Sequence, residues 1–89
     1  MQDGIDDTLA ERGARYGVFT EHAKIAQALK EIMWETGGWR RLAPDQKQSL
    51  EVIADKVARI LNGDPDYDDN WRDIAGYAKL VLDRLTAQP

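Results

Sequence analysis

The sequence contains no cysteine, a single histidine and no long hydrophobic run. Without cysteine the chain can form neither a disulfide framework nor a thiolate zinc site, which fits a reducing cytoplasm. No segment approaches the ~20 consecutive apolar residues that a membrane-spanning helix needs. The first seven residues are acidic and lack the basic and apolar regions of a signal peptide. These absences predict a cytoplasmic protein that does not insert into a membrane.

An excess of basic residues is also missing. Twelve Lys and Arg stand against sixteen Asp and Glu, which gives a net charge of -4 with the histidine neutral. Binding to duplex nucleic acid draws on a dense basic surface, so we do not expect it here. A small phosphate ligand held by two or three local bases remains compatible with this charge.

The length of 89 residues predicts one domain over residues 1–89. No segment alternates apolar and polar residues, and three segments instead carry apolar residues at helical spacing. The first begins at Thr20 as its N-cap and ends before Gly37. The second begins at Pro44 and stops at Asn62-Gly63, and the third runs from about Asp69 to Leu85.

This pattern predicts an all-α fold, a small antiparallel three- to four-helix bundle. Residues 20–85 form its helical core, and residues 1–19 form a partly ordered N-terminal arm with a short helix over about 6–13. A domain of this size buries only ~60% of the surface of the unfolded chain, so we expect a homo-oligomer. Three tryptophans are expected to close the ends of the bundle: Trp34, Trp39 and Trp71.

The third segment carries a glycine in its interior, Gly76. Glycine there costs ~1 kcal/mol relative to alanine, so we expect another helix or a ligand to approach its backbone closely.

The candidate ligand site lies between the second and third helices. At 100° per residue, Lys56 and Arg59 fall on one shoulder of the second helix, and Asp73 and Tyr77 on one shoulder of the third. If these shoulders meet, the bases can hold a phosphate while Tyr77 stacks on a nucleotide. The alternative is an ionic clamp between the two bases and the carboxylates of Asp69 and Asp73.

Two further residues are assigned to ligand binding, Arg15 and Tyr16. They form a basic and aromatic elbow between two glycines, before the first long helix. The lone histidine, His22, is expected at the surface or in a cap, and the sequence offers no nucleophile with a positioned base.

A metal site is the second possibility. Asp69 and Asp73 lie one helical turn apart and together present oxygen ligands to Mg²⁺, although capping explains Asp69 as well. Glu51 and Asp55 fall on the far side of the second helix, where we expect a solvated acidic face.

Three motifs carry a family resemblance: Arg15-Tyr-Gly17, Lys56-Val-Ala-Arg59 and Asp69-x-Trp71-x-Asp-Ile-Ala-Gly-Tyr-Ala78. Over Glu11 to Leu85 the chain resembles an uncharacterised family of small all-helical proteins from tailed phages and prophages. It is similar, more distantly, to helical domains associated with nucleotide and DNA-base modification and to MazG-type nucleotide pyrophosphatases. The last hold magnesium with Glu-x-x-Glu and Glu-x-x-Asp helices, and this chain departs from that spacing.

The resemblance implies a phage-encoded accessory protein of the host cytoplasm. The first hypothesis is a non-catalytic module that binds a nucleotide or nucleotide-derived signal, for example to sequester it from host defence, and needs no cofactor. The second is a magnesium-dependent, MazG-like pyrophosphatase. The third is a protein–protein inhibitor that binds a host enzyme through its acidic surface.

Overall fold

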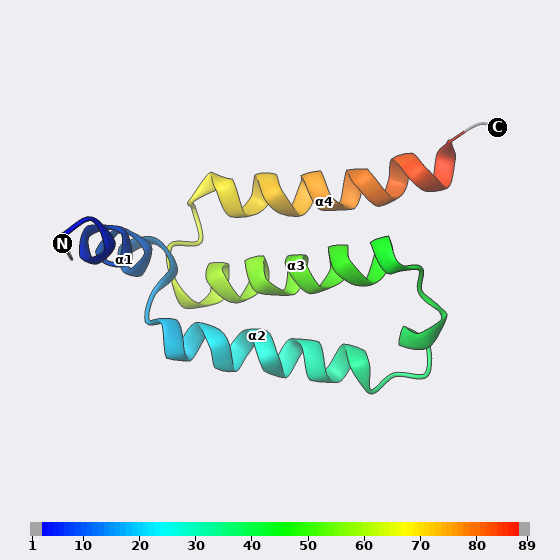
Figure 1. The fold of residues 1–89 in the computed structure, drawn as a ribbon, viewed down its shortest axis with the longest axis horizontal. Helices are drawn as coiled ribbons and strands as arrows, with labels where there is room; N and C mark the ends of the chain where they lie inside the picture. The colour runs from blue at the N-terminus through cyan, green and yellow to red at the C-terminus, as the bar shows by residue number, and fades with distance from the viewer. Residues whose placement is uncertain (1–2, 88–89) are drawn as a thin grey trace.

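The computed structural model describes residues 3–87 and contains four α-helices and one 3₁₀ turn (Figure 1). The elements follow one another as α1 (Asp3–Tyr16), α2 (Phe19–Trp34), η1 (Trp39–Arg41), α3 (Pro44–Asn62) and α4 (Asp68–Thr86). No strand occurs within the described residues. The predicted all-α class is therefore confirmed.

The predicted ends of the long helices agree with the structure where the chain carries a strong local signal. Pro44 begins α3 as predicted, and the side-chain oxygen of Gln46 accepts a 2.8 Å hydrogen bond from the N–H of Ala43. The prediction of Thr20 as the N-cap of α2 was wrong. Helix α2 begins at Phe19 after an extended Val18, and no side chain caps it.

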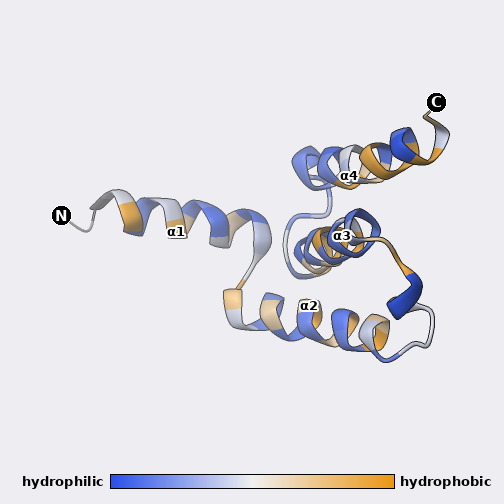
Figure 2. Ribbon diagram, turned by 45° about the vertical axis from the view of Figure 1, so that its right-hand side comes forward, coloured by the Kyte–Doolittle hydropathy of each residue, from blue (hydrophilic) through white to orange (hydrophobic). Residues whose placement is uncertain are grey.

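The N-terminal arm is a longer helix than the sequence predicts. Helix α1 spans 14 residues and projects away from the other three helices (Figure 2). It contacts α2 and α3 through its C-terminal part, where the chain turns at the elbow.

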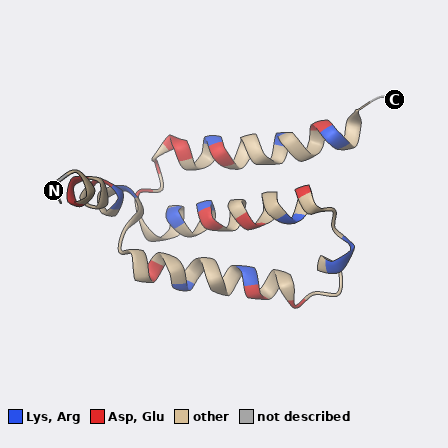
Figure 3. Cartoon of the chain, viewed as in Figure 1, with Lys and Arg blue, Asp and Glu red and all other residues tan. Residues whose placement is uncertain are grey.

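Helices α2, α3 and α4 lie side by side and run antiparallel, with α3 in the middle (Figure 1). Helix α3 packs against both neighbours, while α2 and α4 have little contact with each other. Ion pairs fasten the layer: Lys30 of α2 lies 2.9 Å from Asp55, and Lys56 of α3 lies 2.9 Å from Asp73 of α4. Figure 3 shows these charges interspersed along the three helices.

The core of the single chain is small. Among the residues that the structure describes, the buried apolar side chains are three alanines, Ala26, Ala54 and Ala58. The expected core role of the tryptophans was wrong for Trp34 and Trp71, which are exposed; Trp39 is half-buried. The indole N–H of Trp34 donates a 2.8 Å hydrogen bond to the carboxylate of Glu51, and that of Trp71 donates one of 2.8 Å to the carbonyl of Pro65.

The expected close approach to Gly76 does not occur within the chain. A Cβ placed on this glycine meets no atom within 4 Å. Among residues 3–87, no helix has the length and apolar character needed to cross a bilayer.

Candidate functional site

The elbow between α1 and α2 is anchored to the end of α3 by directional hydrogen bonds. The side-chain amide of Asn62 donates two bonds of 2.9 Å, to the carbonyls of Tyr16 and Val18. The N–H of Asp64 donates a third bond, of 2.8 Å, to the carbonyl of Arg15. Three carbonyl groups of the elbow are thereby held against one short segment, which gives the elbow a single defined geometry.

Two glycines permit this close approach. Gly17 has a φ of +80°, a conformation that L side chains rarely adopt, and a Cβ there would collide with the carbonyl oxygen of Asn62. On the opposite side, a Cβ on Gly63 would collide with the backbone of Arg15 and Tyr16. The Asn62-Gly63 pair was predicted as a helix stop, and the structure shows that it also packs directly against the backbone of the elbow.

Two tyrosine rings lie between two arginine side chains behind the elbow. The guanidinium of Arg15 lies 4.2 Å from the ring centroid of Tyr67, and that of Arg59 lies 4.5 Å from the ring of Tyr16. The two tyrosine rings are 6.1 Å apart and tilted by 56°. Such contacts contribute ~0.5–1 kcal/mol each at exposed sites. The stack therefore orients Tyr16 and Arg59 toward the other side of the elbow.

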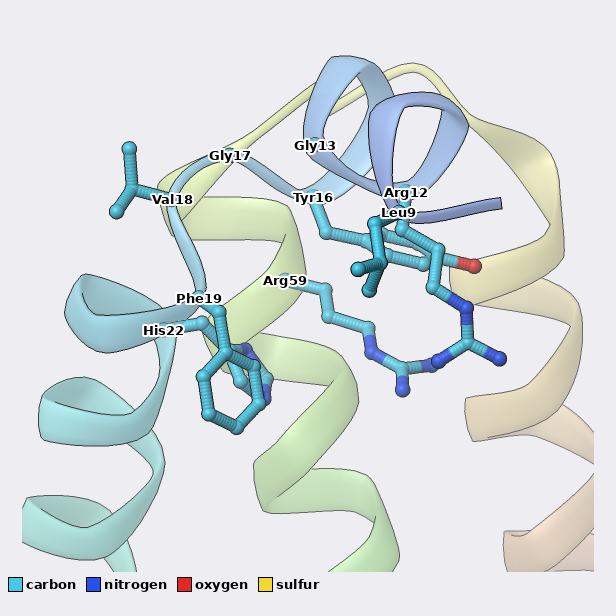
Figure 4. Close-up of a pocket in the computed structure, with 9 residues that line it drawn as sticks. All are labelled: Leu9, Arg12, Gly13, Tyr16, Gly17, Val18, Phe19, His22 and Arg59. Carbon is cyan, nitrogen blue, oxygen red and sulfur yellow. The ribbon is translucent and has the colours of Figure 1, made fainter. Parts of the chain in front are cut away.

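A cavity of about 380 Å³ opens on that side, between α1, the first turn of α2 and the end of α3 (Figure 4). It is lined by Leu9, Arg12, Gly13, Tyr16, Gly17, Val18, Phe19, His22 and Arg59. Arg12 and Arg59 reach the cavity from α1 and α3, and Figure 4 shows their guanidinium groups on the same side of it as Tyr16. The rings of Phe19 and His22 lie together on the α2 side, 6.1 Å apart, while the side chain of Val18 points away.

The cavity carries uncompensated positive charge. Most basic side chains of the chain pair with an acid, but Arg12 and Arg59 form no ion pair with the acidic side chains that the structure describes. No Asp or Glu lines the cavity. An anion is the ligand that two such guanidinium groups recognise best.

His22 adds a group that is neutral near pH 7. Burial lowers its pKa below the ordinary value, and the nearby charge of Arg59 lowers it further. Its Nδ1 is buried and has no hydrogen-bond partner among residues 3–87. The expected surface or capping role of His22 was therefore wrong, since the ring is half-buried in the wall of the cavity.

The structure divides the predicted ligand site into two parts. Tyr16 and Arg59 both line the cavity, and Arg15 lies behind it, where it pairs with Glu11 at 2.7 Å. Lys56 instead forms the 2.9 Å ion pair with Asp73, as in the predicted ionic clamp.

Tyr77 also lies away from the cavity. It is half-buried on α4, where its backbone carbonyl accepts a hydrogen bond of 3.3 Å from Ser49. Neither Tyr77 nor Lys56 lines the elbow cavity.

Three cavity residues were missed or undervalued from the sequence: Arg12, Phe19 and His22. Arg12 precedes Tyr16 by four residues, so both lie on one side of α1. That spacing would have revealed the pair if the helix had been extended to Tyr16. Nothing in the sequence alone brings Arg59 to the same place, because that contact depends on the docked elbow.

The carboxylates assigned to magnesium contact cations or donors of the protein. Asp69 accepts a 2.8 Å hydrogen bond from the hydroxyl of Tyr67, which raises the pKa of that tyrosine, and also pairs with Arg72. Asp73 is held by Lys56. The residues that the structure describes contain no group of three or more side chains able to hold a metal ion.

The expected solvated face of Glu51 and Asp55 was wrong. Glu51 accepts the indole hydrogen bond of Trp34, and Asp55 pairs with Lys30, so both carboxylates face α2. The ion pair between Lys56 of α3 and Asp73 of α4 lies across the other interface of α3.

The chain belongs to the family described as Domain of unknown function (DUF6378), which matches residues 5–84. The matched segment includes α1 from its third residue, the elbow and nearly all of α4. No curated protein and no solved structure matches the chain.

Proposed function

We propose that this protein binds a nucleotide or nucleotide-derived signal in the elbow cavity without converting it. One observation carries the proposal. Two guanidinium groups that have no acidic partner among the described residues, those of Arg12 and Arg59, line one cavity beside aromatic rings. Phosphate and a planar base are the two parts of a nucleotide that these groups recognise.

The cavity offers a place for each part of such a ligand. Its volume of about 380 Å³ is within the ~300–1,000 Å³ range of small-molecule sites. Arg12 and Arg59 would bind the phosphate, and the 76% exposed Phe19 offers a free ring face for stacking. Helix α2 begins at the rim with uncapped N–H groups, and the positive end of its dipole also favours an anion.

The lining favours binding over hydrolysis. Metal-assisted attack on a phosphate draws on carboxylates that hold the ion and orient water, and the cavity wall contains neither Asp nor Glu. Among residues 3–87, no carboxylate accepts a hydrogen bond from Nδ1 of His22 to orient the ring as a base. The magnesium-dependent pyrophosphatase is thus the second candidate, and Asp69 and Asp73 would serve it only after leaving their present partners.

The resemblance to small phage and prophage proteins suggests a setting for this role. A phage-encoded protein that sequesters a nucleotide signal would protect the phage from a host defence response in the host cytoplasm. Such a role needs tight, selective binding and no turnover.

The test is a thermal-shift screen of the purified protein against mononucleotides, trinucleotides and cyclic dinucleotides, with and without Mg²⁺. A ligand at 100 times its Kd adds ~2.7 kcal/mol to the free energy of unfolding. We expect at least one nucleotide to raise the Tm without Mg²⁺. Arg12→Gln should weaken its binding at least tenfold, because it removes one of the two guanidinium groups that would hold the phosphate. Arg12 is exposed, so we expect the substitution to leave the fold intact.

Arg40→Gln is the matched control. Arg40 is an exposed arginine of η1, at the end of the layer opposite the elbow (Figure 3), so its loss changes the net charge equally and leaves the cavity intact. Equal weakening by both variants would mean a nonspecific charge effect and would contradict the site. Magnesium-dependent release of phosphate would favour the pyrophosphatase. If no nucleotide binds and one host protein is retained in a pull-down, the inhibitor hypothesis replaces the proposal.

A further inference from the structure

The single chain exposes more surface than a compact monomer of its mass. A 10.1 kDa monomer exposes about 5,300 Å², whereas this chain exposes 6484 Å². Its radius of gyration is 15.5 Å, compared with about 12 Å for a compact domain of 89 residues. The projecting helix α1 accounts for part of the difference (Figure 2). The rest arises because α2, α3 and α4 form an open layer.

One face of that layer is apolar. On the central helix α3, Leu50, Ala54, Val57 and Leu61 follow one another at spacings of four, three and four residues, which places them on one line along the helix. Leu50 lies near the middle of the chain and of the layer, yet it remains 40% exposed. A closed bundle would bury this position.

Two shallow grooves flank Leu50 on the same face. One groove lies toward α4 and is lined by Leu50, Ile53, Ala78 and Val81. The other lies toward α2 and contains Leu50 with Ile32. Because Leu50 lines both grooves, they meet at this residue, and together they involve side chains of α2, α3 and α4.

Helix α4 carries a second apolar stripe that the chain itself does not use. Its inner face toward α3 contains Asn70, Ile74, Tyr77 and Val81. Beside this face lies an exposed stripe at spacings of four, three, four and three residues: Trp71, Ala75, Ala78, Leu82 and Leu85. This is the spacing of a helix–helix seam, and Ala78 joins the stripe to the groove beside Leu50.

We propose that this apolar face is the interface of a two-fold homodimer. Its occupant is a second copy because every residue of the α3 and α4 stripes is uncharged, so two chains of net charge -4 can join here without apposed like charges. The area agrees with this assignment. Two copies together carry an excess of about 2,400 Å², and obligate dimers bury about 2,000–5,000 Å². Part of the excess belongs to α1, but even half of it reaches the lower end of a standard interface, which buries about 1,200–2,000 Å².

The dimer also supplies the core that one chain lacks. Three buried alanines contribute little to stability, whereas the faces of two layers would bury leucines and tryptophans against each other. The interface and the elbow cavity are built from different residues. Failure of nucleotide binding therefore says nothing about the dimer, and a monomeric protein would leave the cavity in place.

The test compares two leucines of α4 by sedimentation velocity. Leu82, on the stripe, is 57% exposed, and Leu80 is 66% exposed. They lie about 200° apart around the helix. We expect the wild type to sediment with twice the 10.1 kDa chain mass, Leu82→Lys to halve that mass, and Leu80→Lys to leave it unchanged.

A wild type that stays monomeric from 1 to 100 µM would overturn the proposal, as would a Leu82→Lys protein that remains dimeric. Loss of the dimer in both variants would also overturn it, because the effect would not be specific to the stripe. If Leu82→Lys does not fold, the Tm of the wild type at several protein concentrations tests the proposal instead. A dimer coupled to folding has a Tm that rises with protein concentration, and a Tm independent of concentration contradicts it.

Discussion

The elbow and the open face of the layer are stabilised in different ways. At the elbow, hydrogen bonds from Asn62 and Asp64 and two close backbone contacts hold one geometry. On the open face, leucines remain half exposed and no directional contact defines a partner. Directional polar contacts suit the binding proposed for the cavity, because they hold the backbone around its two arginines in one arrangement. An apolar face without charge suits the proposed association with an identical copy, because the hydrophobic effect is non-directional and scales with the apolar area removed from water.

The largest expected effect is that of Gly17→Ala, which tests the close backbone contact at the elbow. A residue with a side chain is strained at φ +80°, and its Cβ would also collide with Asn62, so we expect a loss of about 3 kcal/mol or more in the free energy of unfolding. Urea denaturation at fixed protein concentration measures it. Gly76→Ala is the matched control, in an open helix interior, and should gain up to about 1 kcal/mol. Equal effects of the two substitutions would show that the elbow is not docked as described.

Asn62→Ala tests the hydrogen bonds separately from the close contact. The substitution removes both hydrogen bonds from the Asn62 amide to the elbow, and the bond to the carbonyl of Tyr16 is partly buried. We expect the free energy of unfolding to fall by about 2 kcal/mol. The Tm should fall by about 8–16 °C for a domain of this size. Gln48→Ala, an exposed amide on the same helix, should change stability by less than about 0.5 kcal/mol. A small effect of Asn62→Ala would mean that the elbow is held by packing alone.

The smallest expected effect concerns His22 and pH. Its folded-state pKa is lowered by burial and by Arg59, so the unfolded chain binds the proton more readily than the folded chain. Stability should therefore be complete above the ordinary pKa of 6.5 and decline as the pH falls from 6.5 through the folded pKa. Urea midpoints at pH 7.5 and 5.0 for the wild type and His22→Gln isolate this contribution. An identical pH dependence in both proteins would place the ring in water.

The fold was largely predictable because its signals are local. Helix α3 begins at Pro44 and ends at Asn62 as the sequence indicates, and α4 agrees within one residue at each end. Helix α2 begins earlier than expected because tertiary contacts, and not a capping side chain, set its start. The length of α1 was underestimated because Gly13 looks like a stop in sequence, yet the helix continues through it to Tyr16.

The site was predictable only in part, for a geometric reason. Helical periodicity places Lys56 and Arg59 on one shoulder of α3, but the two side chains serve different neighbours. Lys56 reaches Asp73 on α4, whereas Arg59 lies one turn further along and stacks on Tyr16 from the elbow. Periodicity within one helix cannot decide which neighbour each residue meets.

By itself, the sequence determined the helical class and the ends of α3 and α4. These properties depend on contacts between residues within a few positions of each other, so they can be read along the chain. Only the tertiary structure decided that Arg12 of α1 and Arg59 of α3 share a cavity, and that the stripe of α4 and the leucines of the α3 stripe stay exposed. Both results depend on how one elbow docks and on how an open layer forms, and such long-range packing leaves no local trace in the sequence.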